Sequence, residues 1–270
     1  MKYEKIKSKI DDIISGRNFL RKIFYAGLNI FLLRAWYVKS EVKKFFNSKG
    51  ENEKVQVLDA RCGFGHYSYF MSKKFKNSKV LGIDINERRI KDCLKFSESE
   101  GIENLKFDVA NLENLNYSDE FDLVLAVDVM EHIENDVKVF ENFHRAMKKG
   151  GMLIISTPSN LGGSEVHTDA DESFIEEHVR SGYGADEIKS KLEMVGFKDV
   201  RVRYSYGRWG NLSWKLMIKI PVLLLGKSFA FAFLLPLYYF VIFIPGLFLM
   251  WLDTKVKNEK GTGLIVVARK

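Results

Sequence analysis

Short apolar runs alternate with longer amphipathic stretches from Val55 onward, and this alternation constrains the fold more than any other feature of the sequence. Runs rich in Val, Ile and Leu are typical of buried strands, and the longer segments between most of them are typical of helices. Strands that alternate with helices predict an α/β fold with a parallel sheet covered on both faces. The expected strands are VQVLDA, KVLGIDI, NLKFDVA, FDLVLAVDV, GMLIIST, KDVRVRYSYG and GLIVVARK.

The chain divides into four segments on this pattern. Residues 51–206 are expected to form the core, which includes a helix at 185–196 that ends at Gly196, and residues 263–270 supply the last core strand. Residues 1–50 are expected to form basic amphipathic helices whose apolar run is too short to cross about 30 Å of hydrocarbon. Residues 207–262 form a hydrophobic insertion.

The insertion contains 24 uncharged residues from Phe229 to Leu252, enough by count to cross a bilayer. Pro236 and Pro245 fall within this run, and Pro221 falls in the shorter run before it. Because proline removes a helical hydrogen bond, we expect these residues to interrupt the helix, so that one straight span is disfavoured.

Charge is distributed unevenly along the chain. Residues 1–50 hold 12 Lys and Arg against 4 Asp and Glu, residues 51–206 hold 21 against 29, and residues 207–262 hold 7 against 2. An acidic centre between basic, apolar flanks argues against nucleic acid as a partner and suits a membrane, where each Lys or Arg near an anionic leaflet contributes about 1 kcal/mol. The alternative is ordinary solvated charge on helix faces. With two cysteines and a charged rather than apolar beginning, we expect a protein of the reducing compartment at the cytoplasmic face of the membrane.

A glycine turn follows the first expected strand, where VQVLDA runs into RCGFGHYS. Gly63 and Gly65 would let the backbone approach a ligand closely, beside the free N–H groups of a helix start. Asp84, 19 residues beyond Gly65, ends the next strand, where a carboxylate can accept from ribose hydroxyls. The alternative is that Asp84 caps the following helix. A NAD-type fingerprint would need glycine at Ser68, which argues against a NAD-dependent enzyme.

The segments VLDARCGFG, GIDI, VANLENL, FDLVLAVDVMEHI and MKKGGMLIISTP resemble, in order and spacing, those of class I S-adenosylmethionine-dependent methyltransferases. The chain looks most similar to the ubiquinone and menaquinone biosynthesis branch and its lipid-modifying relatives, over residues 55–206 and 263–270. The resemblance implies a doubly wound seven-stranded sheet in the order 3-2-1-4-5-7-6, with the last strand antiparallel, and S-adenosylmethionine as cofactor.

The resemblance also implies roles for individual residues. The methionine part of the cofactor would be lined by Asp59, Gly63 and Gly65, and its ribose held by Asp84. The adenine would lie against Ile85, Ala110 and Asn111, with the Asn111 side-chain oxygen accepting from its amine. Asp128 would face the cofactor's amino group or the substrate. These eight expected cofactor-binding residues are Asp59, Gly63, Gly65, Asp84, Ile85, Ala110, Asn111 and Asp128.

Arg61 departs from the family pattern, which has glycine at the start of this turn. A side chain here can clash with the ligand, and a residue with a Cβ resists the backbone angles that the turn requires. Two interpretations follow: cofactor binding is impaired, which we favour, or Arg61 swings out and binds a carboxylate.

Three residues are candidates for catalysis. Glu131 and His132 follow the fourth strand, as in several quinone and lipid methyltransferases, and His132 could serve as general base or simply pack as a structural histidine. His178 belongs to an acidic segment. The resemblance implies that this segment faces the substrate, because the matching region in related methyltransferases tends to do so. That segment could hold a divalent metal, but a solvated loop is the favoured reading, so no metal is expected.

With the strand order that the resemblance implies, strand six ends near Gly207 and strand seven begins near Gly263, both at the edge of the sheet where ligands bind. The insertion therefore leaves and returns beside the active site, and a single crossing would place residues 263–270 on the wrong side of the membrane. We expect a monotopic or re-entrant hairpin and a lipophilic, quinone- or lipid-like substrate. The alternatives are a cofactor-impaired membrane scaffold and a soluble small-molecule methyltransferase whose insertion forms a dimer interface.

Overall fold

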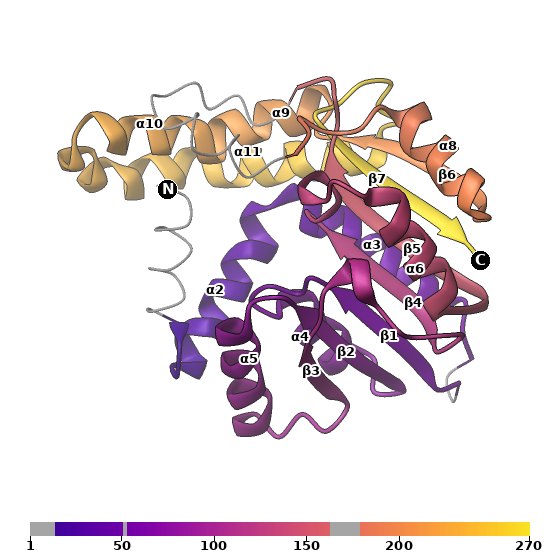
Figure 1. Ribbon diagram of the computed structural model, residues 1–270. Helices are drawn as coiled ribbons and strands as arrows, with labels where there is room; N and C mark the ends of the chain where they lie inside the picture. The colour runs from indigo at the N-terminus through magenta and orange to yellow at the C-terminus, as the bar shows by residue number, and fades with distance from the viewer. Residues whose placement is uncertain (1–13, 51–52, 163–178) are drawn as a thin grey trace.

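The computed structural model describes residues 14–50, 53–162 and 179–270. Seven strands form one sheet in the order β3-β2-β1-β4-β5-β7-β6, in which only β7 is antiparallel to its neighbours (Figure 1). This confirms the fold class expected from the sequence. The strands are β1 (Val55–Ala60), β2 (Ser78–Asp84), β3 (Leu105–Val109), β4 (Phe121–Val127), β5 (Met147–Pro158), β6 (Lys198–Ser205) and β7 (Gly263–Arg269).

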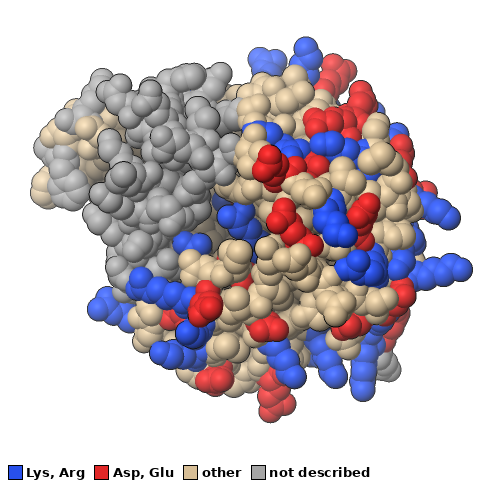
Figure 2. Space-filling view, viewed as in Figure 1, with Lys and Arg blue, Asp and Glu red and all other residues tan. Residues whose placement is uncertain are grey.

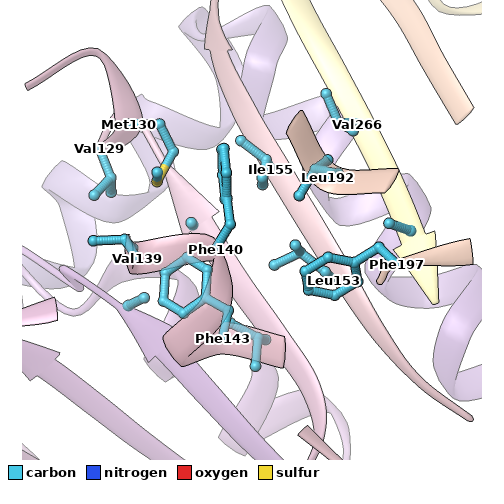
Figure 3. Close-up of a cluster of buried hydrophobic side chains, with 14 of the residues drawn as sticks. Val129, Met130, Val139, Phe140, Phe143, Leu153, Ile155, Leu192, Phe197 and Val266 are labelled. Carbon is cyan, nitrogen blue, oxygen red and sulfur yellow. The ribbon is translucent and has the colours of Figure 1, made fainter. Parts of the chain in front are cut away.

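Helices cover both faces of the sheet, which is why the central strands are apolar along their whole length. Helix α6 (Asp136–Ala146) and helix α8 (Ala185–Val195) pack on one face, and α8 ends at Gly196 in the left-handed conformation, as expected. Phe140 and Phe143 of α6 meet Leu192 of α8 and the strands in this cluster (Figure 3). The opposite face is covered by α3 (Leu33–Asn47), α4 (His66–Lys74) and α5 (Glu87–Ser99).

The first described helix, α2 (Asn18–Phe31), turns sharply into α3 at Leu32, whose backbone is extended. Arg21 is almost completely buried and forms an ion pair with Asp92 of α5. A buried arginine requires a partner of opposite charge, so this pair holds α2 against the core. Helix α2 therefore lies over the region that joins β1 to α4.

The insertion between β6 and β7 is a helical hairpin that projects from the α/β body (Figure 1). The outgoing arm runs from Arg208 to Lys227, and the returning arm is one long helix. The outgoing arm consists of α9 (Arg208–Trp214), a π-helical turn η3 (Lys215–Lys219) and α10 (Ile220–Lys227); a 3-10 turn η4 (Phe229–Leu234) leads into α11 (Leu235–Lys255).

The expectation that proline would interrupt the returning arm is wrong. Pro236 lies in the first turn of α11, where a missing N–H breaks no hydrogen bond, and the helix continues through Pro245. Among the described helices, Phe231–Lys255 is the one long and apolar enough to cross a membrane by length and composition, and 11% of its most apolar window is buried.

The two arms are joined where Pro221 disturbs the outgoing one. Proline has no N–H, and the carbonyl groups of Leu216 and Met217 accept instead from side chains of α11. The hydroxyl of Tyr238 donates to Leu216 O at 2.6 Å, and the hydroxyl of Tyr239 donates to Met217 O at 2.7 Å. The π-helical turn is thus stabilised by the partner helix.

Asp253 anchors the base of the hairpin to the body. Its carboxylate is fully buried and accepts from the Tyr37 hydroxyl at 2.8 Å and from the Gly210 N–H at 2.9 Å. Burial beside this carboxylate raises the pKa of Tyr37, so its phenol remains a donor. Met217 and Met250 join the buried cluster on the same face as Leu33. The hairpin is therefore fixed at its base to α3.

Candidate functional site

The carboxyl ends of β3, β2, β1 and β4 lie side by side and bring together residues that are far apart in the sequence. β1 ends before the glycine turn, β2 ends at Asp84, β3 leads to Asn111, and β4 leads to Asp128. Loops at this edge of a parallel sheet are the usual place for a ligand. The expected cofactor residues thus converge on one edge of the sheet.

The glycine turn has the backbone that the sequence predicted. Gly63 and Gly65 both have positive φ, at +55° and +76°, and α4 begins directly afterwards at His66. A Cβ built on Gly63 would have no atom within 4 Å, whereas one on Gly65 would touch Phe107 and Cys93. Gly63 therefore presents an open side of backbone, and Gly65 is required for packing.

Asp84 ties the second strand to this turn. One carboxylate oxygen accepts from the Gly63 N–H at 3.0 Å, and the other accepts from the Asn86 N–H at 2.9 Å. The α5 N-cap is Asn86, whose side chain accepts from the Arg89 N–H at 3.1 Å, so Asp84 does not serve as the helix cap. Each carboxylate oxygen has a further lone pair for a ligand hydroxyl. Ile85, next along the chain, is 64% exposed and available to a flat ligand.

Asp59 lies behind the turn, in the protein interior. It is buried and accepts from the Ser68 hydroxyl, and burial raises its pKa to about 6. Ser68 occupies the position where a NAD-type fingerprint would have glycine. The Asp59–Ser68 hydrogen bond fixes the first turn of α4 to the end of β1, so Asp59 shapes the turn from beneath.

Arg61 adopts the left-handed conformation, with φ of +61°. This is the conformation that glycine adopts at no steric cost, and the sequence comparison expected glycine here. The side chain is half-buried, and no hydrogen bond or ion pair joins it to another residue in the described ranges. Arg61 therefore keeps the family's backbone geometry at a cost in strain.

Ala110 and Asn111 follow β3 beside Asp84. The Ala110 N–H donates to the Asp84 carbonyl at 3.2 Å, which joins the two strand ends. The Asn111 side-chain oxygen accepts from the Glu113 N–H at 3.0 Å and caps the 3-10 turn η1 (Leu112–Asn114). Its second lone pair is free to accept from a ligand amine, the role that the resemblance gives it.

Asp128 lies at the far end of the site, after β4, with φ of +52°. It forms an ion pair with Arg34, the second residue of α3. The backbone N–H of Arg34 donates to the Tyr206 hydroxyl at 3.2 Å, and Tyr67 lies within the electrostatic reach of both charges. We call Arg34, Tyr67, Asp128 and Tyr206 the acceptor cluster.

Sequence reasoning found only Asp128 of this cluster. The sequence pattern assigned no role to Arg34 or Tyr67, and Tyr206 entered only as the last residue of the expected core. The sequence signal that marks Arg34 is a cation at the start of a helix, which is a common feature on its own. Burial raises the pKa of Tyr67 and of Tyr206, so both phenols remain protonated near neutral pH.

Glu131 is buried in the short 3-10 turn η2 (Met130–His132). The Thr157 hydroxyl donates to its carboxylate at 3.0 Å. Burial, together with the nearby negative charge of Asp128, raises the pKa of Glu131 to about 7. A carboxyl group that titrates near neutral pH can take or give a proton during a reaction. The His132 ring nitrogen lies 4.0 Å from this carboxylate, so the two expected catalytic residues are neighbours.

His178 lies outside the described residues, as does most of the acidic segment considered for metal binding. Among residues 14–50, 53–162 and 179–270, no group of His, Cys, Asp and Glu has the arrangement of a metal site.

Helix α2 closes one side of the glycine turn, a contact that the sequence did not predict. The Tyr25 hydroxyl donates to the Phe64 carbonyl, and the Phe24 ring packs edge-on against the Phe64 ring at 5.3 Å. These contacts hold the middle of the turn from outside and leave the open side of Gly63 toward Asp84.

This arrangement fits S-adenosylmethionine. The open backbone at Gly63 can receive the methionine part, the Asp84 carboxylate the ribose, and Ile85, Ala110 and Asn111 the adenine. When bound, this cofactor supplies a methyl group on a sulfonium, and the acceptor cluster lies at the end of β4 next to the turn. The fold and the site are those of a class I S-adenosylmethionine-dependent methyltransferase.

The chain belongs to the methyltransferase domain family, whose model matches residues 51–201. It is 26% identical over 162 residues to phosphoethanolamine N-methyltransferase 1 of Triticum aestivum, covering 58% of this chain and 31% of that protein. It is 28% identical over 129 residues to the ubiquinone biosynthesis O-methyltransferase of Pelagibacter ubique, covering 46% and 52%. The chain therefore spans a third to a half of the length of these two relatives.

A similar fold is present in phosphoethanolamine N-methyltransferase 2 of Haemonchus contortus, solved in complex with S-adenosyl-L-methionine. The TM-score is 0.58 at 18% identity, covering 85% of this chain and 51% of that one. This likeness concerns the fold.

Proposed function

We propose that this methyltransferase modifies a lipophilic, quinone- or lipid-like acceptor at the cytoplasmic face of a membrane, to which it attaches as a monotopic or peripheral protein. The observation that carries the proposal is the hairpin of residues 207–262, which has an apolar outer face and whose two ends lie beside Tyr206 of the acceptor cluster. Ser205 and Gly263 are paired across β6 and β7, so both ends of the hairpin leave the sheet at one point.

The outer face of α11 presents a stripe of large apolar side chains at helical spacing. Phe240 and Ile244 are 86% and 69% exposed, and the stripe continues in both directions along the helix. A contiguous exposed apolar surface of this kind is costly in water and typical of a membrane or protein interface. We define the α11 stripe as Leu237, Phe240, Val241, Ile244, Phe248 and Trp251.

Attachment to one side of the membrane is supported by the pairing of β7. This strand pairs with β5 from Met152 to Pro158 and with β6 on its other edge, so it belongs to the same folded body as the cofactor site. The outgoing arm carries Lys215 and Lys219, which a span through hydrocarbon would disfavour. A hairpin that lies in the interface satisfies both constraints. In Figure 2, charged side chains of both signs intermingle over the α/β body.

The name of one relative fits a lipophilic acceptor, whereas the other is named for a charged, water-soluble compound. One is named for ubiquinone biosynthesis and O-methylation, and another for phosphoethanolamine and N-methylation. For a hydroxyl acceptor, a base must remove the proton as the methyl group is transferred. Glu131, whose pKa of about 7 lies near physiological pH, is the residue we assign to hold that proton, with His132 beside it.

The test uses the full-length protein in lipid nanodiscs with S-adenosylmethionine labelled in its methyl group. Lipid extract from cells that lack the gene is added, and the label is followed into the organic phase. We expect transfer that depends on Asp84 and is lost when the α11 stripe is made polar. Transfer into water-soluble compounds alone, by a protein that is monodisperse without detergent, would instead identify a soluble enzyme with an apolar dimer interface. Absence of cofactor binding would identify a scaffold.

A further inference from the structure

A second concave site lies outside the glycine turn, between α2, α3 and α4. It has a volume of about 420 Å³ and is lined by four lysines, with Tyr69 and Phe70 among the aromatic residues of its wall; the lysines are Lys22, Lys39, Lys73 and Lys74. No carboxylate is among the lining residues within the described ranges of the chain. Like charges gathered in one concavity repel one another, which is a cost that an anionic ligand would relieve.

Most of these charges are not neutralised within the described part of the chain. Lys22 pairs with Glu100 at 2.6 Å, but no ion pair joins Lys39, Lys73 or Lys74 to a described carboxylate. Lys39 lies over the Phe70 ring, with its ammonium nitrogen 4.2 Å from the ring centre. Burial and the nearby Lys43 lower the pKa of Lys39 to about 8, as expected for a cation that lacks a counter-ion.

The wall of the pocket is held in a defined geometry by Asn29. Its side-chain oxygen accepts from the Lys39 ammonium and lies 2.6 Å from the His66 ring nitrogen. Burial lowers the pKa of His66 to about 3, so the ring is neutral and donates one N–H to Asn29. The Trp36 indole donates in turn to the Asn29 backbone carbonyl at 2.7 Å. Lys39 is therefore oriented by a partly buried network of hydrogen bonds, unlike a lysine on a free surface.

The pocket opens next to an apolar face of α2. Lys22 and Asn29 line the pocket, one helical face away from Phe19, Ile23 and Ile30, which are exposed at helical spacing. An exposed apolar stripe beside a basic concavity matches the two parts of a phospholipid, the acyl chains and the phosphate.

The third face of α2 points to the hairpin. The ring of Phe31, at the end of α2, packs against Tyr239 at 5.9 Å and against Phe243 at 6.1 Å, both from α11. The exposed apolar face of α2 thus lies between the basic pocket and the hairpin. One membrane surface can therefore contact the pocket, the apolar face of α2 and the hairpin together.

We propose that this pocket binds the phosphate of an anionic phospholipid headgroup, and so orients the enzyme on the membrane. The inference rests on the proposed membrane function and adds a lipid class to it. Lys39, Lys73 and Lys74 supply the charge, and the exposed face of α2 contacts the acyl chains. A free phosphate compound has the same anionic chemistry but has no acyl chains to contact the apolar face of α2.

The experiment measures binding of the full-length protein to vesicles by flotation. Vesicles of phosphatidylcholine alone are compared with vesicles that contain phosphatidylglycerol at constant ionic strength. The test variant is Lys39→Gln/Lys73→Gln/Lys74→Gln. The control variant, Lys79→Gln/Lys106→Gln/Lys198→Gln, removes the same charge from exposed lysines at the amino ends of β2, β3 and β6. Titration with inorganic phosphate forms the second arm.

We expect phosphatidylglycerol to strengthen binding of the wild-type protein and of the control variant. The test variant should lose more than about tenfold of that gain, since each lysine near an anionic surface contributes about fivefold. Equal binding by the test and control variants would overturn the headgroup site while leaving the membrane function in place. Tight binding of inorganic phosphate at these lysines without preference for anionic vesicles would overturn the lipid assignment. Failure of the wild-type protein to bind either vesicle would refute the membrane proposal itself.

Discussion

Arg34 forms an ion pair with Asp128, and its backbone N–H donates to the hydroxyl of Tyr206 at 3.2 Å. Arg34 comes from the N-terminal helices, Asp128 from the end of β4, and Tyr206 from the residue that precedes the hairpin. The two segments that flank the core therefore meet at the point where the acceptor is expected. Their contact makes the shape of the acceptor cluster depend on both.

Replacing Arg34 with Met should affect acceptor use more than stability. The Arg34 and Asp128 side chains are 39% and 30% exposed, and ion pairs of this kind contribute at most about 1 kcal/mol to the free energy of unfolding. We expect a higher KM for the acceptor with an unchanged Kd for the cofactor, measured by steady-state kinetics and calorimetry. Arg201→Met, at an exposed site on β6, is the control. Equal acceptor KM in both variants would remove Arg34 from the acceptor cluster.

Glu131→Gln should change the pH dependence of the reaction. A general base acts when deprotonated, so the wild-type rate should rise as pH increases through about 7 and then level off. The Gln variant should be slow at every pH and lack that rise, whereas Glu134→Gln, at an exposed neighbouring site, should retain it. A wild-type rate that does not change between pH 6 and 8 would contradict the assignment.

The same substitution should alter stability in a defined direction. Burial raises the pKa of Glu131 above that of the unfolded chain, so folding favours the protonated form. The stability contributed by this group is present below about pH 4 and is lost as pH rises through about 7. Urea unfolding should therefore show a fall in wild-type stability across this window that is absent in Glu131→Gln.

Asp84→Asn should weaken cofactor binding by about 1 kcal/mol or more, because a charge-assisted hydrogen bond is lost. The amide keeps the size of the side chain, and its one oxygen can still accept from the Gly63 N–H, so the bond to the turn is retained while the bond from the Asn86 N–H is lost. Calorimetry with S-adenosylmethionine measures the effect, with Asp108→Asn on the neighbouring strand as control. Unchanged affinity would exclude Asp84 from the ribose site.

Arg61→Gly separates two accounts of the unusual turn. Because Arg61 has φ of +61°, glycine should relieve strain of about 1 kcal/mol and raise the melting temperature. We expect cofactor binding to tighten by a similar amount, since no described residue holds the Arg61 side chain. Weaker binding would show that Arg61 contacts the cofactor carboxylate. Identical affinity would mean that the side chain points to solvent and that both accounts fail.

A polar α11 stripe should detach the protein from membranes without unfolding it. Phe240→Ser/Ile244→Ser/Phe248→Ser changes exposed residues that do not belong to the buried clusters, so circular dichroism and cofactor affinity should be retained. Flotation with phosphatidylcholine vesicles should be lost. Met194→Ser, at an exposed site on α8, should float like the wild-type protein. Retained flotation of the triple variant would show that the stripe is not the membrane contact.

The strands and the glycine turn were predictable because they depend on local pattern. Apolar runs define the strands, and β1 begins and ends at the expected residues. The left-handed backbone at Arg61 is the conformation of glycine, which a residue with a Cβ was expected to resist. The continuous helix through Pro245 was not expected, because the apolar pattern does not show whether a helix continues past one lost hydrogen bond.

The acceptor cluster and the basic pocket were not predictable, because both depend on long-range contacts. Arg34 lies 94 residues before Asp128 in the sequence, and nothing local to either residue indicates the pair. Similarly, Lys39 becomes part of the basic pocket only when α3 packs beside Asn29 of α2 and His66 of α4. The charge distribution along the sequence showed that the N-terminal segment is positively charged, but it did not show how its lysines are arranged in space.

The buried carboxylate of Asp253 fixes the hairpin to the α/β body at its base and leaves the rest of the hairpin projecting. All residues of the α11 stripe lie on the tip side of Asp253. Of the two residues that hold its carboxylate, Tyr37 lies in the body and Gly210 lies at the start of the outgoing arm. In the proposed membrane arrangement, the height of the active site above a bilayer would therefore be set by residues at the base of the hairpin, away from the lipid contact. Lengthening or shortening the turn between Lys227 and Leu235 would then change the membrane contact, whereas loosening Asp253 would change the angle at which the proposed acceptor approaches Asp128.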